Sequence, residues 1–266
     1  MAKGENTEPR RVRGMFNRIA HRYDLLNHLL SANFDRRWRR LAARELPGQP
    51  GLRVLDLCGG TGDLSIEVAR PGGIDRVVCC DFAHDMLTRA AAKFRRRTID
   101  SFCLVTEADG LRLPFVDASF DAVTVGFGVR NFVDLATGLR EILRVLRPGG
   151  RLVILEFSTP SLPLLDRLYG IYLGRILPRL GDRVAGNRGP YGYLARTIAD
   201  FPDPAGLAGQ IREGDPVLPA GEHGVGAQAA ESGRGRSRPA QRAELADRYW
   251  RICGIRHPDR VPRGSE

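Results

Sequence analysis

The chain lacks any long apolar run. No stretch of its 266 residues approaches the roughly 18 consecutive apolar residues that a membrane-spanning helix needs. The polar, basic N-terminus is not followed by the apolar segment of a secretory signal. We therefore expect a soluble, cytoplasmic protein without a transmembrane helix.

Cysteine is scarce, and its spacing shows no pairing pattern. There are five cysteines, an odd number, and no two have the C-x-x-C spacing of a zinc or redox site. These observations argue against a disulfide framework and fit a reducing compartment. No cluster of His, Cys, Asp and Glu has the spacing of a metal site, so we expect no metal.

Acidic residues are fewer than basic residues in this chain. Lys and Arg number 41 against 31 Asp and Glu, a formal net charge of +10. Such a surface is either a solvated arginine-rich face or an attractor for nucleic acid, anionic lipid or an acidic ligand. Aromatic residues do not interleave with the arginine clusters as a single-strand stacking platform requires, so we expect no nucleic-acid partner.

Short apolar segments alternate with helical segments from residue 53 onward, after two expected helices within 16–46. This order predicts a doubly wound, mostly parallel α/β sheet of the Rossmann-like kind with helices on both faces. Strands are expected at 53–57, 77–81, 102–106, 120–125 and 151–156, with helices at 63–70, 84–97 and 135–146.

A glycine-rich turn follows the first expected strand and opens a helix, with the sequence V-L-D-L-C-G-G-T-G-D over residues 54–63. Open α/β sheets bind ligands at this carboxyl edge. Gly59, Gly60 and Gly62 allow a ligand to approach the backbone. Asp81 ends the second strand, where a carboxylate can accept hydrogen bonds from both hydroxyls of a ribose. The pattern predicts an adenosine-type ligand, although a glycine turn that serves only packing is the alternative.

Two further carboxylates, Asp56 and Asp63, flank the turn. They would repel a pyrophosphate but suit a ligand that carries an ammonium and a sulfonium. The charge pattern therefore favours S-adenosylmethionine over NAD. Asp109, followed by Gly110 after the third strand, is placed to reach the adenine amino group, or is an exposed loop acid.

A series of motifs between residues 16 and 202 resembles the quinone-biosynthesis C-methyltransferases, which methylate demethylmenaquinone and, in some bacteria, a ubiquinone precursor. The Gly-rich motif fits most methyltransferases, whereas the F-G-x-R-N and L-E-F-S segments are much more specific. The matching segments are Phe16–Ala20 with Tyr23, Asp24 and Asn27, then Leu55–Asp63, Leu113–Phe115, Phe120–Asp121, Gly126–Asn131, Leu146–Gly150, Leu155–Ser158, Leu177–Arg179 and Tyr191–Leu194.

The resemblance implies a methyl transfer from S-adenosylmethionine to a ring carbon of a reduced demethylquinone. It also implies that Thr61, Asp81, Asp109 and Gly110 bind the donor. Asp109-Gly110 departs from the more common Asn-Ala, and Gly126 stands where Ser is common. The complete set of expected donor-site residues is Asp56, Gly59, Gly60, Thr61, Gly62, Asp81, Asp109 and Gly110.

Ring methylation needs a group that stabilises the developing phenolate and a group that accepts the hydroxyl proton. Arg130 and Asn131 follow the fourth strand and are expected to stabilise the oxyanion, since an arginine is no ordinary base. Tyr23 and Asp24 are the expected proton-acceptor candidates, with His21 as a weaker one. A surface-charge role is the alternative for Arg130.

Composition divides the chain into three parts. Residues 1–13 are expected to be a disordered leader, 14–213 the methyltransferase domain, and 214–266 an atypical, largely disordered tail. The resemblance calls for a closing C-terminal hairpin, which this tail does not match, so we expect the hairpin to be absent. A catalytically impaired, truncated relative and a methyltransferase for another small molecule therefore stay open as alternatives.

The expected partner is a quinol whose isoprenoid tail resides in the membrane. The apolar segment 162–177 is either a buried helix or one that closes over an apolar substrate. With the arginine surface, it is expected to dock the protein on the inner face of an anionic membrane. The sequence leaves the oligomeric state open.

Overall fold

The computed structural model describes residues 9–31, 33–157 and 190–214. The apolar segment 162–177 and the tail from residue 215 onward, where we expect the closing hairpin to be absent, lie outside these residues. The expectations about them stay predictions.

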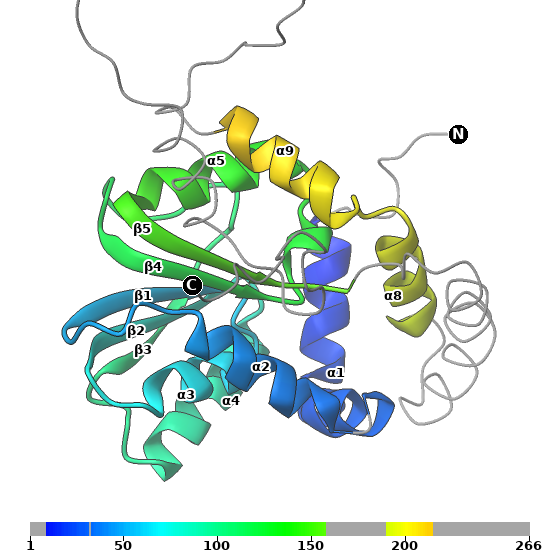
Figure 1. Cartoon of the computed structure of the whole chain (residues 1–266). Helices are drawn as coiled ribbons and strands as arrows, with labels where there is room; N and C mark the ends of the chain where they lie inside the picture. The colour runs from blue at the N-terminus through cyan, green and yellow to red at the C-terminus, as the bar shows by residue number, and fades with distance from the viewer. Residues whose placement is uncertain (1–8, 32, 158–189, 215–266) are drawn as a thin grey trace, which may run out of the picture.

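A parallel sheet forms the centre of the described structure (Figure 1). Its five strands lie in the order β3-β2-β1-β4-β5, and every pairing between neighbours is parallel. The expected doubly wound, Rossmann-like sheet is confirmed. The strands are β1 Leu52–Leu57, β2 Ile74–Asp81, β3 Cys103–Glu107, β4 Phe120–Gly126 and β5 Leu146–Leu155.

The strand order reverses between β1 and β4, because the chain first builds outward to β3 and then returns to the other side of β1. In open α/β sheets this reversal leaves a crevice at the carboxyl ends of the strands, where ligands bind. The Gly-rich turn follows β1 at this point.

Helices cover both faces of the sheet (Figure 1). Helices α2, α3 and α4 pack on one face, and α5 and α9 on the other. The helices are α1 Pro9–Leu30, α2 Phe34–Arg44, α3 Asp63–Ala69, α4 His84–Arg96, α5 Leu135–Val145, α8 Pro190–Ala199 and α9 Pro204–Gly214, with the 3-10 turn η1 at Val129–Asn131.

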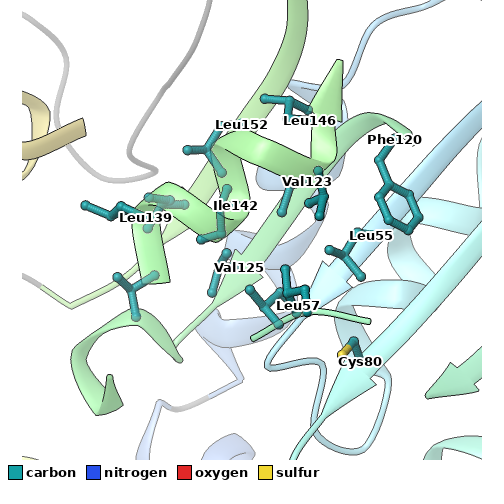
Figure 2. Close-up of a cluster of buried hydrophobic side chains, with 14 of the residues drawn as sticks. Leu55, Leu57, Cys80, Phe120, Val123, Val125, Leu139, Ile142, Leu146 and Leu152 are labelled. Atoms are coloured by element: carbon teal, nitrogen blue, oxygen red, sulfur yellow. The ribbon is translucent and has the colours of Figure 1, made fainter. Parts of the chain in front are cut away.

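Helix α5 shows how the apolar pattern selects a face. Leu139 and Ile142 recur at helical spacing and lie buried in the cluster that also holds Val125 of β4 and Leu152 of β5 (Figure 2). Burying an aliphatic side chain of this size contributes about 1.5–3 kcal/mol. The carboxylate of Asp134 caps the helix by accepting the N–H of Thr137 at 3.0 Å.

Helix α1 corrects one sequence expectation. It begins at Pro9, so residues 9–13 are helical and do not belong to a disordered leader. Val12 is buried, and Phe16 and Tyr23 pack around Met86 of α4. This apolar contact with the sheet domain orders the first turns of α1, which a basic composition alone does not reveal.

Candidate functional site

The Gly-rich turn is shaped by close packing on two sides. A Cβ on Gly59 would lie 2.5 Å from Sγ of Cys79, and a Cβ on Gly62 would lie 2.7 Å from Cε1 of Phe94. Gly60 has φ +55° and open space where its Cβ would be. Gly59 and Gly62 thus let the turn seat on the sheet and on α4, while Gly60 faces open space that a ligand can enter.

Asp81 joins the end of β2 to this turn. Its carboxylate accepts the N–H of Gly60 and the N–H of Ala83, each at 2.9 Å. Burial raises the pKa of Asp81 to about 6, and the nearby Glu107 carboxylate adds to the rise. The side chain therefore lies at the turn, as expected of a group that receives ribose hydroxyls.

Asp56 lies deeper, and both of its carboxylate oxygens have partners. It accepts hydrogen bonds from Ser65 Oγ at 2.5 Å and from Thr124 Oγ1 at 2.9 Å. The side chain is fully buried, and this desolvation raises its pKa to about 6. Asp56 therefore ties α3 and β4 to β1 and also lines the base of a hollow below the turn.

A cleft with about 760 Å³ of open space lies at the carboxyl edge of the sheet. Phe82, Met86 and Leu111 give it apolar walls, and α1 contributes Phe16 and Tyr23. An adjoining hollow of about 320 Å³ shares with the cleft Tyr23, Cys58, Gly60 and Gly126.

Asp109 and Gly110 line the cleft, as expected of residues that contact the donor. The Asp109 carboxylate accepts the N–H of Leu111 at 2.9 Å, which fixes the loop after β3. Gly110 is buried, and a Cβ there would lie 2.9 Å from Cε1 of Phe132. The loop therefore depends on Gly110 for its approach to Phe132.

Thr61 connects the turn to α1. Its hydroxyl donates to Oδ1 of Asp24 at 2.5 Å. Lys93 of α4 contacts Thr61, Asp24 and Asp63, so the Asp63 carboxylate is paired within the protein. The expectation that the charge of Asp63 favours a cationic ligand therefore needs a correction. Lys93 lies 2.6 Å from the Asp63 carboxylate and already compensates its charge.

Arg130 forms a buried ion pair. Its Nη1 lies 2.5 Å from Oε1 of Glu156 and donates to the carbonyl of Phe127 at 2.6 Å. Its guanidinium also lies over the ring of Phe157. Arg130 is not among the residues that line the cleft. Arg130 is therefore not placed to contact a substrate oxyanion directly, and Glu156 already compensates the charge of its guanidinium.

Asn131 does line the cleft. The hydroxyl of Tyr193 on α8 donates to Oδ1 of Asn131 at 3.0 Å. With its oxygen occupied, the amide presents its N–H groups as the remaining polar function. Burial raises the pKa of Tyr193, so this phenol stays protonated as a donor, while the positive charge of Arg130 opposes the rise.

The chain is similar to known proteins over most of its length. Residues 4–229 match the profile of the ubiE/COQ5 methyltransferase family. The chain belongs to the ubiE/COQ5 methyltransferase family. It is 46% identical to a protein named demethylmenaquinone methyltransferase from Beutenbergia cavernae, covering 82% of this chain and 85% of that one. The protein of the same name from Thermus thermophilus is 47% identical, covering 73% and 87%.

One solved structure, the [4+2]-cyclase SpnF, superposes with a TM-score of 0.54 at 20% identity, covering 71% of this chain and 88% of that one. At this identity the likeness concerns the fold alone. The match to the ubiE/COQ5 methyltransferase family is a match of sequence, and its range of residues 4–229 includes every residue that lines the cleft.

Not every expected site residue of this family member lies at the cleft. Tyr23 does, and burial raises the pKa of its hydroxyl, against the opposing charges of Arg130 and Arg39. His21 is exposed and is not among the lining residues. Asp24 points to Thr61 and Lys93.

Sequence reasoning missed Arg39, Lys93 and Tyr193. Arg39 is buried, is ion-paired with Asp35 and lines the smaller hollow. It stands within an arginine run that was interpreted as surface charge. For Tyr193 the motif Tyr191–Leu194 carried a signal, whereas nothing around Lys93 distinguishes it from a solvated helix lysine.

Proposed function

We propose that this ubiE/COQ5 methyltransferase transfers a methyl group from S-adenosylmethionine to a ring carbon of reduced demethylmenaquinone. The observation that carries the proposal is the cleft in which Asp81 is bonded to Gly60 of the Gly-rich turn. It occurs in a chain 46% identical to a protein named for this reaction.

The site suits the donor in shape and charge. Asp81 would receive the ribose hydroxyls, and the apolar wall of Phe82, Met86 and Leu111 would cover the adenine. Arg39, in the hollow below the turn, would face the donor's carboxylate. When bound, the donor supplies an electrophilic methyl group on its sulfonium.

The acceptor carbon becomes nucleophilic when the quinol loses a hydroxyl proton to water. The ring carbon then gains the methyl group as the donor's S–CH3 bond breaks, leaving S-adenosylhomocysteine, and it releases its own proton to restore the aromatic quinol. Asn131 would donate its amide N–H groups to the resulting oxyanion, since Tyr193 holds the amide oxygen. Arg130 acts indirectly: its guanidinium, paired with Glu156 and bonded to the carbonyl of Phe127, fixes the η1 turn that carries Asn131. Tyr23 is the α1 side chain able to exchange a hydrogen bond with the substrate hydroxyl.

The reaction is tested with labelled donor and a panel of quinones, followed by mass spectrometry. We expect label on demethylmenaquinol and none on the oxidised quinone, because only the quinol carries an electron-rich ring carbon. Methylation of a simple phenol but not of any quinol would support the alternative of another small-molecule methyltransferase. Donor binding without any methyl transfer would support an impaired relative.

We further propose that the protein meets an anionic membrane through the outer face of α2, because the substrate's isoprenoid tail lies in a bilayer. Phe34 and Leu41 are 54% and 40% exposed on this helix. Four arginines are exposed beside them, and no helix of the described residues is long and apolar enough to cross a membrane. A basic helix with exposed apolar side chains suits the headgroup region. The arginines are Arg36, Arg37, Arg40 and Arg44.

Replacing Arg36 and Arg37 together by Gln should weaken binding to anionic vesicles by about 30-fold, since each arginine contributes about 1 kcal/mol near such a surface. Flotation at increasing salt measures it. The matched control replaces Arg95 and Arg96, exposed on α4. Equal loss in both variants, or equal binding to neutral vesicles at every salt concentration, would contradict docking through α2.

A further inference from the structure

Lys93 joins three separate elements at one ammonium group. Its Nζ lies 2.6 Å from Oδ1 of Asp63 at the start of α3, 2.7 Å from Oδ2 of Asp24 on α1, and 3.0 Å from Oγ1 of Thr61 in the Gly-rich turn. The lysine side chain is only 11% exposed. Its three donors therefore match three oxygens in a largely water-excluded position.

The cluster is closed by a fourth contact that does not involve the lysine. The hydroxyl of Thr61 donates to the other oxygen of Asp24, at 2.5 Å. Each carboxylate in the cluster therefore depends on neighbours from other elements. The carboxylates of Asp24 and Asp63 each lie within 2.7 Å of Nζ, so without the ammonium they would remain close together in a partly buried site. Their like charges would then repel each other strongly.

Helix α1 is the element that this repulsion would displace. It crosses the carboxyl edge of the sheet and supplies Val12, Phe16 and Tyr23 to the cleft. Tyr23 immediately precedes Asp24, so a displacement of Asp24 moves the phenol as well. Lys93 itself is not among the lining residues of either hollow, whereas its partners Thr61 and Asp63 line the smaller one.

We propose that Lys93 is a positioning residue that fastens α1 to the donor turn and so holds Tyr23 over the methyl-donor site. Lys93 also leaves the cluster of Asp24, Asp63 and Lys93 with a single formal negative charge. This charge suits a donor that carries an ammonium, and the lysine prevents repulsion between the two carboxylates. The second part rests on the proposed donor. The fastening of α1 does not, since it concerns contacts within the protein.

The experiment compares Lys93→Met with Arg89→Met, which removes an equal charge from an exposed site on the same helix. Amide hydrogen exchange is measured on the full chain without ligand. In Lys93→Met we expect exchange in residues 9–30 to rise about tenfold or more, with β1 and β2 unchanged, because a partly buried ion-paired cation is lost. Arg89→Met should leave α1 as in the parent protein.

A second variant separates fastening from general damage. Adding Asp24→Asn to Lys93→Met removes the repulsion, so α1 exchange should return toward the parent value. Calorimetry with S-adenosylhomocysteine should show affinity weakened about tenfold in Lys93→Met and partly restored in the double variant.

Three results would overturn the proposal: unchanged α1 exchange in Lys93→Met, an equal rise throughout the sheet, or a double variant more dynamic than the single one. Failure of the parent chain to bind the adenosyl ligand would instead count against the proposed function. The ligand-free exchange would then still decide whether Lys93 fastens α1.

Discussion

Replacing Arg130 by Met should lower the free energy of unfolding by about 3–5 kcal/mol, the usual cost of leaving one partner of a buried ion pair alone. The stranded group is Glu156, whose side chain is 2% exposed. Turnover should fall as well, but by less than the roughly 100- to 1000-fold that a direct oxyanion donor supplies, because Arg130 only holds the η1 turn that carries Asn131. Urea unfolding and initial rates with saturating donor measure the two effects separately.

A double variant distinguishes these two roles of Arg130. Adding Glu156→Gln removes the stranded charge and keeps an acceptor for the N–H of Phe157, which lies 2.9 Å from the carboxylate. Stability should therefore recover while turnover stays low. Recovery of both would show that the ion pair with Glu156 serves stability alone and that Arg130 does not position Asn131.

A control for the stability measurement is Arg147→Met. Arg147 is 42% exposed and paired with Asp121. Its loss should cost no more than about 1 kcal/mol, because Arg147 is solvent-exposed and Asp121, although only 12% exposed, keeps the N–H of Arg53 as a partner. A loss as large as that of Arg130→Met would mean that burial of the ion pair is not the cause.

Replacing Asp81 by Asn should weaken donor binding by about 1.5–3 kcal/mol, the scale of hydrogen bonds to a charged acceptor. Calorimetry with S-adenosylmethionine at pH 7.5 tests this. Asp75→Asn is the matched control, because Asp75 is exposed near the other end of the same strand. Unchanged affinity in Asp81→Asn would remove this residue from the donor site.

Asp81 also predicts a pH dependence with a definite sign. Burial raises its pKa to about 6, so the carboxylate is ionised above that pH and protonated below it. Only the ionised form accepts two hydroxyl hydrogen bonds, so donor affinity should fall by up to about tenfold per pH unit below 6. The loss should be smaller in Asp81→Asn, where the buried Asp56, with its pKa also raised to about 6, still titrates.

The same two carboxylates act oppositely on the stability of the ligand-free protein. Their raised pKa values mean that the folded chain holds protons more strongly than the unfolded chain between about pH 4 and 6. Their contribution to the unfolding free energy should therefore decrease as pH rises through this window.

The sequence by itself determined the sheet, the turn and the position of Asp81. Buried parallel strands have local signatures, apolar runs bounded by Gly and Pro, and parallel topology brings their carboxyl ends to one edge. Gly59, Gly60, Gly62 and Asp81 therefore meet there as expected. The family's motifs follow the same order, because they sit at the strand ends.

Only the tertiary structure decided which charges are free. Arg130 is compensated by Glu156, 26 residues away, and Asp24 by Lys93 on another helix. Tyr193 sets the amide of Asn131 from 62 residues away. No periodicity records such pairings, since each depends on how separate elements pack. The same packing makes residues 9–13 part of α1. Burial of Val12 against the folded domain outweighs a local composition that is typical of disordered segments.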